Sequence, residues 1–133
     1  MIHEEIVTFE VAKLAKEKGF PQDECGVNIG YYAWDGLRKI HSLVNSFAWY
    51  NDEYNHDNLF LAPTQSLLQR WLREEKGYYV YPFFDNVQLK WDWVCREKTG
   101  DKWIPLVGYD FHLFDTYELA LEAALKYALK NLI

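Results

Sequence analysis

The side chains best suited to chemistry in this chain are its four histidines, because histidine changes charge near neutral pH. None of them belongs to an HExxH, HxH or HxxxH pattern, so the sequence contains no ready-made metal site. Asp110 and His112 are two residues apart and would project from one face of a strand, opposite Gln88 and Asn86. They could form a small enzyme or metal site, but a solvated polar sheet face is the simpler explanation.

The two cysteines, Cys25 and Cys95, do not point to catalysis or zinc binding. Neither has a neighbouring histidine, and the sequence contains no CxxC or GxSxG motif and no Gly-rich loop leading into a helix. We expect both thiols to be reduced, unpaired and buried, as free cysteines usually are. These observations favour a non-catalytic protein without a catalytic residue, cofactor or metal over an enzyme.

A polar helix face is the strongest candidate for recognition. In APTQSLLQRWLREEKG, residues 62–77, the apolar side chains share one helical face: Leu67, Leu68, Trp71 and Leu72. Gln65, Gln69 and Arg73 are therefore expected to face water or a partner. Amide and guanidinium groups make directional bonds at low desolvation cost, which suits a partner surface, although an ordinary wet helix face has the same pattern.

Three aromatic residues in and beside the polar segment YNDEYNHDN, residues 50–58, extend this hypothesis. Trp49, Tyr50 and Tyr54 would suit a partner-binding surface if they are exposed, or they cover the core. The segment itself is rich in turn-forming residues and is interpreted as a loop. Before it, GVNIGYYAWDGLRKI favours a hairpin with a turn at Asp35-Gly36, but the apolar spacing over 36–48 also fits a helix.

Two further helices are predicted, near the two ends of the chain. The first runs over about 8–18, with Thr8 as its N-cap and Gly19 at its end. The last follows DTYE, where Asp115 would cap the helix and Glu118 would return the bond. Its wet stripe is formed by Glu118, Glu122, Lys126 and Lys130. Its alanines would allow close approach to a sheet or to a second copy of the chain, so a homodimer remains open.

Between the last two helices the apolar period changes to two, which indicates strands. YYVYPFF is strand-like, with Pro82 suggesting an edge or a strand end, and VQLKWDWVC alternates strictly from Val87 to Cys95. A third strand is expected over about 103–114. A three-residue Lys98-Thr99-Gly100 loop would place Cys95 opposite Trp103 and Leu89 opposite Tyr109.

The totals set limits on the class of protein. A chain of 133 residues with 50% hydrophobic residues can form one globular domain, residues 1–133, with its own core. The net charge of −6 argues against nucleic-acid binding, which needs clustered Lys and Arg. No apolar run is long enough to span a membrane and the first residues do not form a signal peptide, so a cytoplasmic protein is expected.

The expected helix–strand–strand–strand–helix order over 64–132 resembles the double-stranded RNA-binding domain. That family holds phosphates with a basic cluster where its last helix begins. This chain has Asp115, Thr116, Tyr117 and Glu118 there, which would repel phosphate, so the resemblance extends to element order and not to function. Nucleic-acid binding remains the alternative because the many aromatic residues could stack on bases.

A second resemblance rests on the APTQSLLQRWLRE block, a β-region and the closing DTYELALEAALKYALKNL. Residues 62–76 and 115–132, with weaker support from VAKLAKEKGF, resemble a family of small uncharacterised proteins of Bacteroides-type gut bacteria and their phages or mobile elements. The resemblance implies a bacterial, phage or mobile-element origin and no activity.

Together these features predict an α+β fold, with helices packed on a mainly antiparallel sheet in two layers. The expected function is a small cytoplasmic protein-interaction module whose protein partner is unknown.

Overall fold

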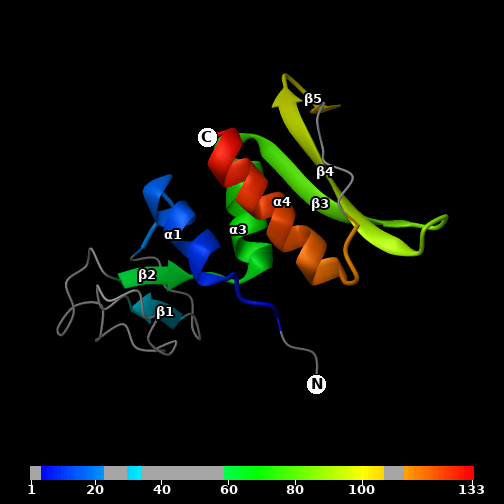
Figure 1. Cartoon of the computed structure of the whole chain (residues 1–133). Coiled ribbons are helices and arrows are strands. Elements are labelled where there is room, and N and C mark those ends of the chain that lie inside the picture. The colour runs from blue at the N-terminus through cyan, green and yellow to red at the C-terminus, as the bar shows by residue number, and fades with distance from the viewer. Residues whose placement is uncertain (1–3, 23–29, 34–58, 107–112) are drawn as a thin grey trace. The chain divides into compact units, whose positions relative to one another are not determined.

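The computed structural model describes residues 4–22, 30–33, 59–106 and 113–133 (Figure 1). The described chain is a mixed α+β protein that divides into two compact units. One unit spans 6–64, and the other joins residues 1–5 to 65–133. The elements are α1 (Phe9–Glu17), β1 (Gly30–Ala33), β2 (Leu59–Ala62), α3 (Gln65–Trp71), the π-helical turn η2 (Leu72–Lys76), β3 (Tyr78–Asp85), β4 (Lys90–Thr99), β5 (Lys102–Pro105) and α4 (Tyr117–Asn131).

Helix α1 confirms the first predicted helix together with both of its ends. The Thr8 hydroxyl accepts a hydrogen bond from the backbone N–H of Val11, which otherwise has no partner in the first turn. Gly19 follows the helix with φ +95°, and the N–H of Phe20 donates back to the carbonyl of Ala15. The chain therefore leaves α1 through a glycine in the left-handed region.

The same unit contains a two-stranded antiparallel sheet. Strand β1 pairs with β2, from Gly30 opposite Ala62 to Ala33 opposite Leu59. The strand expected around residues 30–33 is thus present, and its partner is β2. The rest of the predicted hairpin, the 36–48 segment and the 50–58 loop lie outside the described residues.

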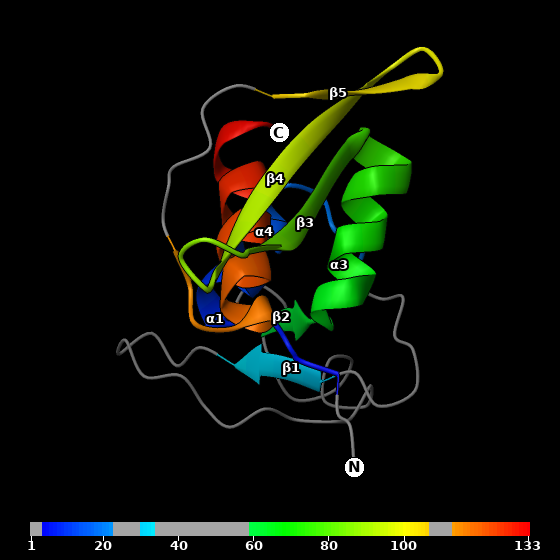
Figure 2. The same ribbon diagram turned by 90° about the vertical axis from the view of Figure 1, so that its right-hand side faces the viewer.

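The other unit contains a three-stranded antiparallel sheet in the order β3–β4–β5, with α4 lying against one face (Figure 2). Odd-numbered residues of β4 face α4, because Trp91 contacts Tyr117 and Trp93 contacts Tyr127, with ring centroids 5.4 and 5.0 Å apart. Residues 65–131 thus have the predicted helix–strand–strand–strand–helix order.

Strand β4 begins three residues later than its alternating pattern predicts. Residues 86–89 form the turn between β3 and β4, and Val87 and Leu89 are 91% and 69% exposed. The Asp85 carboxylate accepts hydrogen bonds from the N–H groups of Val87 and Gln88, and Leu89 has φ +57°. This Asx-type turn competes with the ladder and ends the strand, so the alternation of Val87 and Leu89 had no structural meaning.

The predicted register between β4 and β5 is wrong. Lys98 lies opposite Trp103 and Thr99 opposite Lys102, so the loop is the two-residue turn Gly100-Asp101 and not Lys98-Thr99-Gly100. Gly100 has φ +63° at the first turn position, where a two-residue hairpin of type II′ needs glycine. Cys95 therefore does not oppose Trp103. The expected third strand is present as β5 and as a bridge from Phe114 to Trp91, with 107–112 outside the described residues.

Helix α4 buries one continuous side and is capped one residue later than predicted. Its N-cap is Thr116, whose hydroxyl accepts from the N–H of Leu119, whereas Asp115 forms an ion pair with Lys90. The buried residues are Ala120, Leu121, Ala124, Leu125, Ala128 and Leu129. They confirm that α4 supplies much of the core of this unit. Among the described helices, none is long and apolar enough to cross a bilayer.

Candidate functional site

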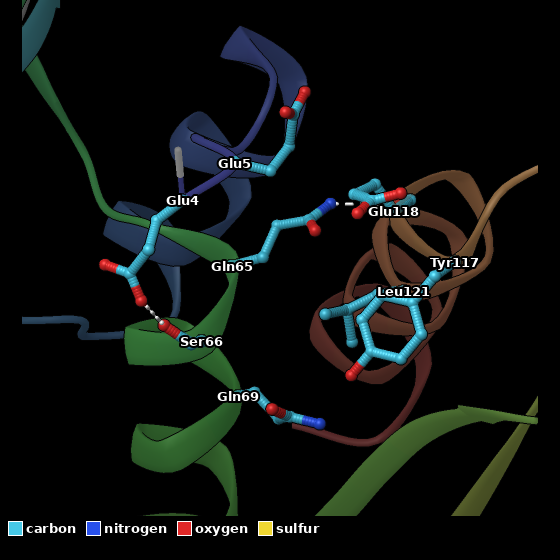
Figure 3. Close-up of a pocket in the computed structure, with 8 residues that line it drawn as sticks. All are labelled: Glu4, Glu5, Gln65, Ser66, Gln69, Tyr117, Glu118 and Leu121. Carbon is cyan, nitrogen blue, oxygen red and sulfur yellow. Dashed lines mark hydrogen bonds between the residues drawn. The ribbon is translucent and has the colours of Figure 1, made fainter. Parts of the chain in front are cut away.

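An open pocket of about 170 Å³ lies where the first turns of α3 and α4 meet the segment around residue 5 (Figure 3). All of the described lining residues belong to the unit that joins residues 1–5 to 65–133. They are Glu4, Glu5, Gln65, Ser66, Gln69, Tyr117, Glu118 and Leu121. The pocket therefore contains two of the residues that the sequence singles out for recognition, Gln65 and Gln69.

Two hydrogen bonds attach the residue 4–5 segment to α3. The backbone N–H of Gln65 donates to the carbonyl of Glu5 over 2.8 Å, and the Ser66 hydroxyl donates to the Glu4 carboxylate over 2.7 Å. Both donors belong to the first turn of α3, where backbone N–H groups have no partner within the helix. The segment is thereby fixed as one wall of the pocket.

Gln65 is buried, so the prediction that its side chain faces outward is wrong. It is only 5% exposed and reaches from α3 to α4 (Figure 3). Its Nε2 donates to the backbone carbonyl of Glu118 over 2.9 Å and to Oε2 of Glu122 over 3.0 Å. Both protons of the amide are thus satisfied, which makes burial of this polar side chain tolerable.

Gln69 lies one turn further along α3 and bonds to the edge of the sheet. Its Nε2 donates to the backbone carbonyl of Val80 over 2.7 Å. Trp91 and Cys95 of β4 bond to Phe114 and Leu106, away from β3, so the β3 residues opposite them direct their backbone groups outward. Val80 is one of these residues. Gln69 therefore satisfies a carbonyl that β4 cannot reach.

These bonds fix the orientation of both amides. The groups facing the two Nε2 atoms are carbonyl and carboxylate oxygens, which only accept hydrogen bonds, so each NH2 group must point at them. In the described part of the chain, neither Gln65 Oε1 nor Gln69 Oε1 accepts a hydrogen bond. Two amide oxygens are therefore available in the pocket, whereas the NH2 groups of both glutamines are already bonded.

The rim of the pocket adds negative charge and an aromatic ring. No described lysine or arginine forms an ion pair with the carboxylates of Glu5 or Glu118. Tyr117 is 41% exposed, while Leu121, at 3%, is buried beneath the rim. The lining thus combines unpaired acceptors with an apolar base and an accessible ring, and it offers a ligand places to donate hydrogen bonds.

Arg73, the third residue of the predicted polar face, does not line this pocket. Its guanidinium lies 5.4 Å from the ring centre of Tyr79 and 4.0 Å from the Glu74 carboxylate. On the same side of the sheet, Tyr79 contacts the rings of Tyr81 and Trp103. Gln65 and Gln69 are therefore brought together, and Arg73 belongs to an aromatic cluster on the sheet face opposite α4.

The other candidate residues lie outside the described part of the chain. This applies to the partner-binding candidates Trp49, Tyr50 and Tyr54, and to the alternative enzyme or metal site at Asp110 and His112. Asn86 and Gln88, the residues that the sequence predicts opposite that alternative site, are exposed in the 86–89 turn. Within the described residues, no group of three His, Cys, Asp or Glu side chains could hold a metal ion.

Cys95 matches the prediction for a buried, unpaired thiol, while Cys25 lies outside the described residues. Burial, with a smaller contribution from the negative charge of Glu97, raises the pKa of Cys95 to about 11. A thiol with this pKa is almost fully protonated at neutral pH and is a poor nucleophile. Cys95 is a core residue.

Sequence reasoning missed the pocket residues that come from outside α3. Glu4 and Glu5 lie about sixty positions from Gln65, and no local pattern connects them. The sequence alone places Tyr117 in a helix start that repels phosphate, and Glu118 in the wet stripe of the same helix. The available signal was the acidic start of α4, whose carboxylates repel phosphate and can pair with a cation.

Comparison with models of known families, with curated proteins and with solved structures gives no match to this chain.

Proposed function

We propose that the protein is a small, non-catalytic protein-interaction module that contacts its partner through the Gln65–Gln69 pocket. The observation that carries this proposal is the set of unpartnered acceptors in one place: two amide oxygens and the Glu5 and Glu118 carboxylates. Acceptors that line a pocket and find no donor among the described residues are suited to a donor supplied by a partner.

The same lining argues against an enzyme. The described lining residues include no histidine, cysteine or lysine, and the one serine hydroxyl among them donates to the Glu4 carboxylate. The groups present can bind and orient, but a nucleophile with an adjacent base is missing from the lining. A binding role fits these side chains better than a reaction does.

Nucleic-acid binding has one observation in its favour, the aromatic cluster beside Arg73. Arg96 also belongs to this face, where its Nε donates to the Tyr81 hydroxyl over 2.9 Å. The rings of Tyr79, Tyr81 and Trp103 contact one another, which uses part of the surface that bases would need for stacking. The acidic pocket and the net charge of −6 favour a protein partner.

The resemblance of the 62–74 block to small proteins of gut bacteria and their mobile elements supports a bacterial, phage or mobile-element origin. A cytoplasmic location and a homodimer are part of the same proposal. A second copy of the chain is one candidate partner, but it would have to use a surface other than Ala120, Ala124 and Ala128, which are buried in the core of their own unit.

The test is quantitative capture of partners from bacterial cells that naturally contain the protein. The bait is the whole chain, either unchanged or carrying Glu118→Lys, which reverses one charge at the exposed rim. We expect that the variant captures severalfold less of at least one protein that the unchanged chain enriches, because like charge at an interface is repulsive.

The matched control is Glu75→Lys, which makes the same charge change on the exposed side of η2, outside the pocket. Equal capture by the unchanged chain and by both variants would contradict the pocket as the partner surface. Melting temperatures of all three proteins establish that they are folded.

A further inference from the structure

The pocket offers almost only hydrogen-bond acceptors, and this restricts what it can bind. The amide protons of Gln65 and Gln69 are directed at Glu118, Glu122 and Val80. The Ser66 proton is directed at Glu4. A carboxylate or phosphate ligand would find the Tyr117 hydroxyl as the one described side-chain donor not already bonded, and it would lie beside the carboxylates of Glu4, Glu5 and Glu118, which repel it. The complementary ligand donates and carries positive charge.

Gln65 separates this site from a mere group of surface acids. Gln65 is only 5% exposed, yet its Oε1 has no donor among the described residues. Figure 3 shows that the amide lies between α3 and α4, with its oxygen on the side of Gln69 and Tyr117. Because no described buried side-chain atom lacks a partner, this oxygen is open to the pocket, where a ligand N–H can replace the solvent that otherwise bonds to it.

The arrangement of the acceptors favours a planar group over a point charge. The lining residues that carry acceptor oxygens come from three separate elements: Glu5, the two glutamines of α3, and Glu118 of α4. A guanidinium has five N–H donors in one plane and can serve several acceptors at once, whereas an ammonium has three donors on one atom. The exposed ring of Tyr117 adds a surface on which a guanidinium can stack.

We propose that this pocket binds the guanidinium of an arginine side chain from a partner protein. Gln65 Oε1 and Gln69 Oε1 accept from the guanidinium, the carboxylates of Glu5 and Glu118 balance its charge, and Tyr117 lies beside it. The volume of about 170 Å³ suits the end of one side chain and not a folded segment. This inference rests on the proposed interaction function and adds the chemistry that the partner must present.

The experiment is a titration of the whole isotope-labelled protein with N-acetyl-arginine amide, followed by NMR. Side-chain NH2 signals of Gln65 and Gln69 and the backbone signal of Glu118 report the pocket. We expect these signals to shift in a saturable way, with a Kd on the order of millimolar for such a small ligand. N-acetyl-citrulline amide has nearly the same shape without charge, and it should bind at least about tenfold more weakly.

Two further arms make the outcome decisive. Glu118→Gln, which removes one exposed carboxylate, should weaken arginine binding severalfold, whereas Glu75→Gln on η2 should leave it unchanged. Equal binding of citrulline, equal or tighter binding of N-acetyl-lysine amide, or shifts that map elsewhere would each overturn the inference.

The result is separable from the test of function. If arginine amide fails to bind while Glu118→Lys still loses a captured partner, the pocket is an interaction site with another ligand. If arginine amide binds as expected and capture is the same for every variant, the chemistry of the pocket is correct and its role as the partner surface is wrong.

Discussion

Helices α3 and α4 each have a polar stripe at i, i+4 spacing, but the two stripes differ in burial. On α4, Glu118 and Lys130 are exposed, and Glu122 and Lys126 are half-buried. On α3, Gln65 is buried and Gln69 is half-buried, each with its NH2 group bonded to a neighbouring element. Amide side chains can turn toward a core that supplies acceptors, whereas burial of a charged group costs far more. Spacing alone therefore does not determine which side of a helix is wet.

The largest expected effect tests the buried side of α4. Leu125 is fully buried, and Leu125→Ala should lower the free energy of unfolding by about 2–5 kcal/mol, the usual range for a core leucine. Leu119→Ala removes the same atoms from a position on the same helix that is 53% exposed, so its cost should stay below about 1 kcal/mol. Urea denaturation measures both, and similar losses would mean that the faces of α4 are assigned wrongly.

The next effect tests the buried side of α3. Gln65→Ala removes the two bonds to α4 and should cost about 1–3 kcal/mol, because Glu122 also loses its buried donor. Gln88→Ala is the control, since Gln88 lies exposed in the 86–89 turn and should change stability by at most about 0.5 kcal/mol. A neutral Gln65→Ala would return this glutamine to the wet face that its spacing predicts.

A smaller effect tests the start of α4. Thr116→Ala removes the N-cap and should cost about 1 kcal/mol. Asp115→Ala should cost only a few tenths, because its ion pair with Lys90 joins two largely exposed side chains. If thermal or urea unfolding shows the larger loss for Asp115→Ala, the cap lies one residue earlier, as the sequence alone suggests.

The smallest effect is the contribution of Cys95, on the sheet face that α4 covers, to the pH dependence of stability. This contribution is zero near neutral pH. Its pKa is about 11 in the folded protein against 9.0 for an ordinary cysteine. Between these values the unfolded chain has lost the thiol proton and the folded chain retains it, so stability falls as pH rises. From about pH 8 to about pH 10, the unchanged protein should lose more stability than Cys95→Ala. Equal losses would place Cys95 outside the covered face.

The sequence predicts the regular elements well where strong local signals agree. Thr8 and Gly19 set the ends of α1, Gly77 ends the α3–η2 helix with φ +78°, and the apolar side of α4 is the buried one. The π-helical turn η2 was not foreseen, because one extra residue in a turn leaves the local composition unchanged. Strand β3 confirms the edge position predicted from Pro82.

Two errors in the strands have different physical causes, a side chain that bonds to the backbone at Asp85 and a turn at Gly100 that is shorter than expected. The Asp85 carboxylate ends β3 by accepting hydrogen bonds from the N–H groups of Val87 and Gln88. Gly100 takes the first position of a turn that is shorter than expected. The turn at Gly100 matches the twist of the two strands, which a linear pattern does not contain. The pocket could not be predicted because Glu5, Gln65 and Glu118 meet only in three dimensions.

Pro82 lies opposite Trp93 in β3, among the residues whose backbone groups point away from β4. A strand from another molecule that added to this edge would find no N–H to accept from at Pro82. Two residues earlier, it would have to displace Gln69 from the Val80 carbonyl. This edge is therefore a poor template for intermolecular strand pairing, and the protein is expected to resist aggregation by edge-to-edge growth of the sheet there even at high concentration.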